Sequence, residues 1–309
     1  MTSVDSASLL VEGPWRHQFV PANGQRFHVT LAGPDDRDAP LVVLLHGTPQ
    51  FWWAWRAQIP LLADAGYRVA AMDVRGSGAS DKPPHGYDVP TLTRDVAGVI
   101  RSLGAADAVV IGSGTGGEIA WGMPALQPEV TRAIGVLGAP HPLDASDDVR
   151  AAVRPAGLGL LAYAQLPALP ERAMLRSDLV ERFLTGWGAP GWLTPAVAAT
   201  YRRAAQVPFA AHSQMEQLRW LVRSVPRPDG RRFRSALRDA APVPVLHVHG
   251  AQDGLRPAAR AALRPQTAQK VASTYRFELV AESGHYLSEE SPEHVGALLV
   301  SWLGEVAPV

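Results

Sequence analysis

The sequence predicts an α/β fold, in which helices flank a mostly parallel sheet and a helical cap is inserted into the chain. Along residues 40–137, short β-branched apolar runs alternate with helical patterns, which is typical of parallel strands joined by right-handed crossovers. The alternation stops after residue 142 and returns at residue 243. A glycine-dense segment, 112–117, joins a strand to the following helix and indicates a sharp turn. We therefore expect a core of residues 1–142 and 239–309 and a cap over 143–238.

Local patterns predict the elements of the first half. Residues 15–31 alternate between polar and apolar and predict an antiparallel edge hairpin. A buried strand is expected over 40–45, a helix over 52–65 that ends at Gly66, and a strand over 67–72. A further helix is expected over 91–103, with Thr91 as its cap and Gly104 beyond its end.

The second half continues the same rhythm around the cap. The strand that begins at residue 108 enters the glycine-dense turn, and another strand is expected over 133–137. Residues 143–238 hold prolines, alanine-rich runs and aromatic residues, and show no strand alternation. Strands resume over 243–248 and 274–280, and the last helix is expected over 292–303.

Composition excludes several classes of function. The 29 basic and 29 acidic side chains balance, so a nucleic-acid partner is not expected. With no cysteine, disulfides, thiolate metal sites and a cysteine nucleophile are excluded. No signal-peptide pattern and no apolar run of membrane-spanning length occurs, so we expect a cytoplasmic protein without membrane contact. No metal cluster or dinucleotide fingerprint is present, so no cofactor is expected; a homodimer stays open.

Five motifs carry a resemblance to a known family. They are His46-Gly47-Thr48-Pro49 with Trp55-Arg56 behind it, the segment 73–83 that begins Asp73-Val74-Arg75-Gly76, the turn 112–117, Ala139-Pro140-His141-Pro142, and Ser283-Gly284-His285. In this order they resemble the epoxide hydrolase and haloalkane dehalogenase group of the α/β-hydrolase fold, over nearly the whole chain outside the cap. The resemblance implies an α/β-hydrolase fold and a small apolar molecule as the partner.

The turn departs from the pattern of that group at its centre. Members usually carry Gly-His-Asp-Trp-Gly-Gly, with the aspartate as nucleophile, where this chain has Gly-Ser-Gly-Thr-Gly-Gly over 112–117. Gly114 therefore stands at the nucleophile position and has no side chain. Thr115 replaces the tryptophan that holds the halide in dehalogenases, and Leu160 and Leu218 stand where epoxide hydrolases carry two cap tyrosines. We expect neither epoxide hydrolase nor dehalogenase activity.

The other site residues that the fold implies are present. His285 follows a strand and a Ser-Gly turn, and Asp253 follows the preceding strand, in the chain order that the fold uses. An acid at that place would hold the imidazole in one tautomer. Thr48 and Thr115 are expected to supply the backbone N–H groups of an oxyanion hole. Glu118 is either a carboxylate at the start of a helix or an acid or base of the pocket.

Three functions stay open on the sequence. The first is non-covalent acid/base chemistry by His285 and Asp253 on an apolar, natural-product-like substrate: elimination, isomerisation, cyclisation or water activation. The second is a hydrolase with Ser113 or Thr115 as nucleophile, and the third is a non-catalytic ligand-binding protein. The expected pocket walls are Trp52, Trp53, Tyr163, Leu160, Leu218 and Trp187. Asp144, Asp147 and Asp148 are expected to be solvated residues at the entry to the cap, with an alternative role as the acid.

Overall fold

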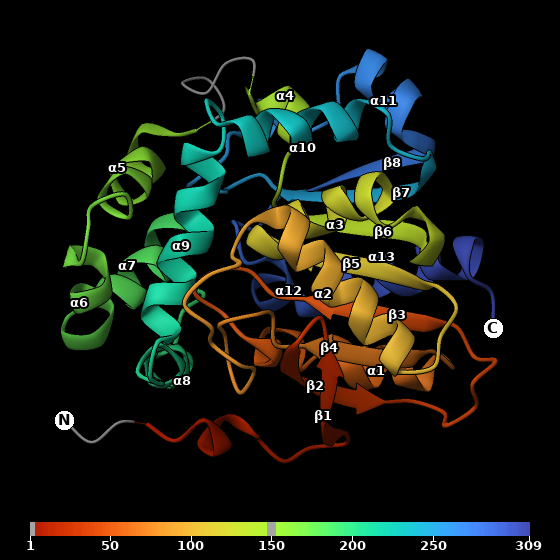
Figure 1. Cartoon of the computed structure of the whole chain (residues 1–309), viewed down its shortest axis with the longest axis horizontal. Helices are drawn as coiled ribbons and strands as arrows, with labels where there is room; N and C mark the ends of the chain where they lie inside the picture. Colours follow the sequence, from red (N-terminus) through yellow and green to blue (C-terminus); the bar gives the residue numbers. More distant parts are fainter. Residues whose placement is uncertain (1–3, 147–152) are drawn as a thin grey trace.

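The computed structural model describes residues 4–146 and 153–309 and contains one eight-stranded sheet (Figure 1). The order of the strands across the sheet is β1-β2-β4-β3-β5-β6-β7-β8. Strands β1 and β2 form the antiparallel hairpin at one edge, β2 pairs antiparallel with β4, and the pairings from β4 to β8 are parallel. The bounds are β1 Arg16–Ala22, β2 Gln25–Ala32, β3 Leu41–Leu45, β4 Arg68–Met72, β5 Ala108–Ser113, β6 Thr131–Leu137, β7 Val243–Gly250 and β8 Ala272–Val280.

The sheet is buried on both faces because its central strands are mostly apolar, and β3 is apolar at every position. Successive side chains of a strand point to opposite faces, so Val42 and Leu44 of β3 pack on one side while Val43 and Leu45 pack on the other. The first face is covered by η2 Trp52–Trp55, α1 Gln58–Asp64 and α13 Pro292–Val306, and the second by α2 Val89–Ser102, α3 Thr115–Leu126 and α11 Pro265–Val271 (Figure 1). This layering places the ends of β5–β8 under the inserted segment.

The regular structure of the inserted segment is helical in the residues that the structure describes. Residues 143–146 and 153–238 contain helices and no strand, and in Figure 1 α5–α9 stand together at the left of the sheet while α10 lies above it. The bounds are α4 Pro142–Ser146, α5 Pro155–Tyr163, α6 Leu169–Arg176, α7 Leu179–Trp187, α8 Pro195–Ala205, α9 Ala210–Arg223 and α10 Pro228–Arg238. The remaining short elements are η1 Ser6–Leu9, η3 Pro128–Val130, η4 Ala258–Arg260 and α12 Leu287–Glu290.

Two helix predictions need correction. The helix expected over 91–103 begins at Val89, because the side chain of Asp88, and not Thr91, caps it by accepting the Thr91 N–H at 2.8 Å. The helix expected over 52–65 is two elements, η2 and α1, because the tryptophan-rich start forms a 3-10 turn whose Trp52 N–H binds Asp73 Oδ1 at 2.8 Å. In the described residues, no helix combines the length and the apolar character needed to cross a membrane.

Candidate active site

The strand–turn–helix at β5 and α3 is built on close backbone approach. A Cβ atom at Gly112 would lie 2.1 Å from the Gly116 carbonyl oxygen, and one at Gly116 would lie 2.5 Å from the Leu45 carbonyl oxygen. Neither position tolerates a side chain, so helix α3 packs directly against β5 and β3. Gly114, between strand and helix, has φ +53° and ψ −118°, a conformation that L-residues rarely adopt.

His285 and Asp253 meet beside this turn. His285 Nδ1 lies 2.9 Å from Asp253 Oδ2, and both side chains are buried. Asp253 Oδ1 accepts the N–H groups of Leu255 at 2.7 Å and Arg256 at 2.8 Å. Burial alone would raise the pKa of Asp253, but the charge of His285 and the hydrogen bond to its ring hold the pKa below the ordinary 3.8. The aspartate is therefore ionised near neutral pH and accepts the Nδ1 proton, which leaves Nε2 as the acceptor.

The Nε2 atom of His285 faces the empty position above Gly114. An ideal Cβ placed on Gly114 would lie 3.1 Å from Nε2, and His285 is one of the residues that line the cavity. Among the described residues, Asp253 is the one hydrogen-bond partner of the His285 ring, so no hydroxyl of Ser113 or Thr115 bonds to it. The pair is thus arranged to move a proton at Nε2.

Backbone contacts from the cap fix this geometry. The carbonyl of Trp187, at the end of cap helix α7, accepts the N–H of His285 at 3.1 Å and that of Gly254 at 2.8 Å. The Trp187 and His285 rings are in edge contact, with centroids 5.4 Å apart. The carboxylate of Glu290 accepts the N–H groups on both sides of His285, from Gly284 at 2.5 Å and Tyr286 at 2.7 Å, and the cap N–H of Ala189 at 3.0 Å.

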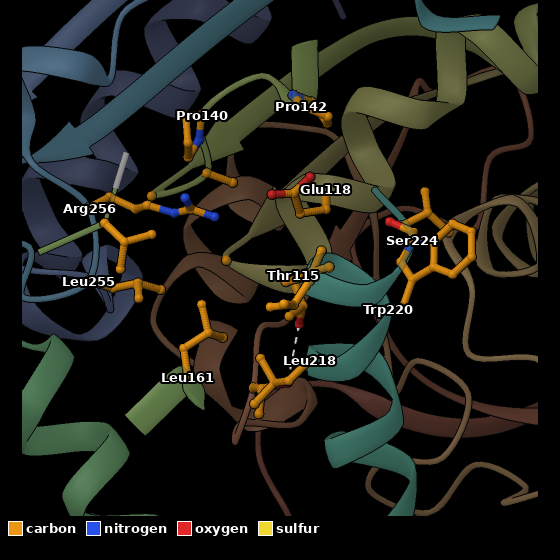
Figure 2. Close-up of a pocket in the computed structure, with 18 of the residues that line it drawn as sticks. Thr115, Glu118, Pro140, Pro142, Leu161, Leu218, Trp220, Ser224, Leu255 and Arg256 are labelled. Atoms are coloured by element: carbon orange, nitrogen blue, oxygen red, sulfur yellow. Dashed lines mark hydrogen bonds between the residues drawn. The ribbon is translucent and has the colours of Figure 1, made fainter. Parts of the chain in front are cut away.

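A cavity of about 300 Å³ lies between the turn and the cap (Figure 2). Apolar side chains from both the core and the cap form most of its wall: Val89, Val153, Leu161, Trp187, Leu218, Trp220, Leu221 and Phe233. Its polar side chains are few, as in most small-molecule sites, and include Thr48, Thr115, Glu118, Arg256 and His285. The site can therefore hold an apolar molecule with a small number of oriented polar groups.

Thr48 and Thr115, the expected oxyanion-hole residues, both line the cavity, with their hydroxyl oxygens 3.4 Å apart. Thr115 is the first residue of α3, where backbone N–H groups have no partner within the helix. The loop that carries Thr48 is held by His46, whose Nδ1 lies 3.1 Å from the Gly47 carbonyl oxygen and whose Nε2 accepts the Val74 N–H at 3.2 Å. Use of these two N–H groups by a substrate oxygen stays a prediction.

Glu118 lies on α3 one turn beyond Gly114, and its carboxyl points into the cavity, where the Arg256 guanidinium faces it (Figure 2). Its side chain is buried, with 7% of its surface exposed. Burial raises the pKa of Glu118 from 4.5 to about 7, against the opposing effect of the positive charge of Arg256. The carboxyl is therefore near half-protonation at neutral pH.

Several expected pocket residues lie elsewhere. Trp52 is fully buried beneath the N-terminal segment, where its indole N–H binds the Leu9 carbonyl at 3.1 Å and its ring contacts Trp15 and His17. Trp53 lies under the Arg56 guanidinium, 3.6 Å from its ring centroid. The place of Trp52 and Trp53 in the sequence predicted aromatic residues near the mouth of the pocket. In the structure, the N-terminal segment and α8 cover that side of the core.

Of the four cap residues expected in the pocket wall, two line the cavity and two do not. Trp187 and Leu218 line the cavity, whereas Leu161 lines it in place of the expected Leu160, which packs within the cap. Tyr163 is not among the residues that line the cavity, and its hydroxyl lies 3.4 Å from the Leu169 carbonyl. A shift of one residue on a helix rotates a side chain by about 100°, so a loose placement of α5 was enough to select the wrong leucine.

The structure also places the candidate nucleophile Ser113 and the candidate acid Asp144 away from the His285 ring. Ser113 is the last residue of β5, is buried, and does not line the cavity. Asp144 accepts hydrogen bonds from Arg264 and Thr267, which tie α4 to α11 instead of placing an acid beside His285. Asp147 and Asp148 lie outside the described residues.

Sequence reasoning missed some of the cavity wall. Arg256 follows Asp253 by three residues and lines the cavity, as does Phe233 of the cap. The signal for Arg256 was its place in the loop that carries the acid. No periodic pattern in the sequence predicts which way a loop side chain points.

The turn between β5 and α3, the His–Asp pair at the ends of β7 and β8, and the cap over the cavity together define an α/β hydrolase. Residues 40–292 match the alpha/beta hydrolase fold family, and the chain belongs to that family. It resembles epoxide hydrolases within it.

Named relatives cover nearly the whole chain. It is 31% identical to the AB hydrolase superfamily protein YfhM of Bacillus subtilis (strain 168), over 93% of this chain and 97% of that protein. It is 30% identical to epoxide hydrolase 4 of Mus musculus, over 92% of this chain and 77% of that protein. The crystal structure of epoxide hydrolase A from Mycobacterium thermoresistibile matches with a TM-score of 0.74 at 25% identity, covering 94% of this chain and 98% of that one.

Proposed function

We propose that this α/β hydrolase family member works without a covalent intermediate and uses His285, oriented by Asp253, as a general base and acid. The observation that carries the proposal is the space above Gly114, which His285 Nε2 faces. A Cβ atom on Gly114 would lie 3.1 Å from that nitrogen. A nucleophilic side chain at that position would project there, and glycine leaves the space to substrate or water. The cavity wall supports an apolar, natural-product-like small molecule as the substrate.

The proposed proton transfer follows from the hydrogen bond between His285 and Asp253. Asp253 holds Nδ1–H, so Nε2 accepts a proton from the substrate or from a water molecule, and the aspartate stabilises the imidazolium that forms. Negative charge that develops on a substrate oxygen would be stabilised by the N–H groups of Thr48 and Thr115. Elimination, isomerisation, cyclisation and direct water activation all use these two steps.

The test uses 5-nitro-1,2-benzisoxazole as a probe of the base. A base removes its ring C–H proton, the C–H electron pair forms the nitrile, the N–O bond breaks and the oxygen leaves as phenolate, so no nucleophile or cofactor is needed. We expect the wild-type protein to open the ring and His285→Ala to lose about 10²–10⁴ in rate. A His285→Ala rate equal to the wild-type rate would refute the proposal.

The names of the relatives favour one alternative, epoxide hydrolysis. In that mechanism as this group uses it, a carboxylate attacks the substrate and an ester forms on the enzyme, for which Gly114 supplies no atom. We expect styrene oxide and haloalkane substrates to give no turnover and no mass increase of the intact protein. Turnover with a trapped ester would establish covalent catalysis and refute the proposal.

A further inference from the structure

We propose that Glu118 is a second catalytic group, which exchanges a proton with a substrate oxygen while His285 acts on a neighbouring carbon. The inference rests on the proposed function of His285 and adds the class of substrate. That substrate is an uncharged hydrophobic molecule with an acidic C–H and an oxygen leaving group β to it. The reaction that the two residues support is a β-elimination.

The first support is position. Gly114 caps the N-terminus of α3, and Glu118 is four residues further along. Residues four apart lie on the same side of a helix, and both of these residues line the cavity. Four residues of helix rise by about 6 Å. A reacting unit of a few bonds can therefore lie between the Nε2 atom of His285, beside Gly114, and the carboxyl of Glu118.

The second support is a carboxyl that forms no hydrogen bond and no ion pair with the described residues. In residues 4–146 and 153–309, the Glu118 side chain makes no hydrogen bond and no ion pair, although only 7% of its surface is exposed to solvent. A carboxylate that served the start of the helix would accept N–H groups of the first turn, and Glu118 accepts none. Burial of a polar group without a hydrogen-bond partner is costly, and a catalytic role is one of the explanations for such a group in a native structure.

The charged and titratable groups around Glu118 come from several elements. Arg256, in the loop after β7, faces it across the cavity, and Arg234 of α10 lines the same cavity. His285 lies in the loop after β8, and His141, in the loop after β6, packs on Trp121 of α3. Burial lowers the pKa of His141 to about 4, so that ring is neutral at pH 7.

The same surroundings keep the carboxyl suited to proton transfer. Arg256 favours the ionised form, and burial, which favours the neutral form, has the larger effect. A pKa of about 7 for Glu118 lets one carboxyl both donate and accept a proton at neutral pH. The geometry and the protonation state therefore point to the same role.

The step balances without a co-reactant. Nε2 of His285 takes the proton from carbon, the C–H electron pair becomes the new π bond, and the C–O bond breaks. Protonated Glu118 gives its proton to the leaving oxygen. The imidazolium then returns a proton to the Glu118 carboxylate through water, which restores both residues.

The first experiment detects the protonated carboxyl without any turnover. Dicyclohexylcarbodiimide is apolar and reacts with a carboxylic acid in apolar surroundings: the acid O–H adds across a C=N bond, with oxygen on carbon and the proton on nitrogen. We expect peptide mapping to find the adduct on Glu118 at pH 6, to find less at pH 8.5, and to find none in Glu118→Gln. Glu118 unlabelled at pH 6, or labelled equally at both pH values, overturns the inference.

The second experiment separates the roles of the two residues. The unsubstituted 1,2-benzisoxazole and its 5-nitro derivative react by the same ring opening, but the unsubstituted phenolate is the poorer leaving group and needs a proton more. We expect Glu118→Gln to slow the unsubstituted probe by at least about tenfold and the nitro probe by less. A purely structural role would slow both equally, and circular dichroism and melting temperature check that the variant folds.

The failures of the two proposals look different in this assay. If His285→Ala abolishes ring opening while Glu118→Gln keeps wild-type rates on both probes, the role of Glu118 is refuted and that of His285 stands. If His285→Ala keeps the wild-type rate, the proposed function itself fails. Equal slowing of both probes by Glu118→Gln refutes the acid role as well.

Discussion

Replacement of Gly114 by alanine is the most direct perturbation of the turn, and its cost can be worked out from two independent terms. The backbone at φ +53° is strained for any L-residue, which costs about 1–3 kcal/mol of unfolding free energy. The added methyl would also lie 3.1 Å from His285 Nε2 and 3.6 Å from the Gly47 Cα. Crowding of this kind in a packed site costs a further ~1 kcal/mol.

A matched control separates the two terms. Gly191 has φ +83° and no atom within 4 Å of an added Cβ, so Gly191→Ala carries the backbone cost alone. Urea denaturation of the wild type and both variants measures the difference. We expect both to be destabilised, and Gly114→Ala to lose more. In a His285→Ala background the excess should disappear, because the crowded ring atom is then gone.

The same position also tests the proposed mechanism. Gly114→Asp would put a carboxylate beside Nε2, where it takes up the space of the substrate and competes for the proton-accepting atom. We expect it to be less stable than the wild type by at least the backbone cost of about 1–3 kcal/mol and slower in ring opening. The reasoning is refuted if Gly114→Ala is as stable as the wild type, or if Gly114→Asp is as stable and turns over faster.

Further predictions concern the residues around the pair. Asp253→Asn should remove the charge that stabilises the imidazolium and lower the ring-opening rate by about 10²-fold or more, which a pH–rate profile measures; an unchanged rate would show that the aspartate does not act. Glu290→Gln should misplace the His285 loop and lower the rate of 5-nitrobenzisoxazole opening, whereas Glu129→Gln, on the exposed surface, should not. Because the pKa of Glu118 is higher in the folded than in the unfolded chain, its protonation stabilises the folded state. This stabilisation is fully present below pH 4.5 and is lost as the pH rises through about 7. The melting temperature of Glu118→Gln should therefore equal that of the wild type below pH 4.5 and exceed it above pH 7, and a constant difference across this range would contradict the titration.

The sheet could be predicted because its signal is local and periodic. The apolar runs of β3 and β5 are continuous and do not alternate with polar residues, as burial on both faces requires, and the glycines of the turn mark where backbones touch. His285 and Asp253 were found in the same way, since each follows a strand whose end the parallel topology brings to one edge. The structure brings them to 2.9 Å.

The cavity wall could not be predicted as well, because it depends on tertiary packing. The tryptophan cluster gave no sign that residues 5–22 would cover it, and Trp52 became a core residue bonded to Leu9. The cap helices have mixed faces, so Leu160 and Leu161 were not distinguishable without the angle at which α5 packs. Arg256 lies in an irregular loop whose backbone is held by the hydrogen bond of the Arg256 N–H to Asp253, and no periodic pattern indicates that contact.

The His–Asp pair owes its geometry to groups other than residue 114. One cap carbonyl, that of Trp187, receives N–H groups from both the histidine loop and the acid loop, and Glu290 fixes the histidine loop on either side. None of these contacts involves a side chain at position 114. Under the proposed mechanism, glycine at the turn therefore dispenses with the covalent step and avoids the strain of an L-residue at that position, while the base, its orienting acid and the cavity stay in place. We therefore propose that this scaffold serves chemistry that needs only a positioned base, and that the carboxyl of Glu118, one helical turn away, extends it to reactions that also need an acid.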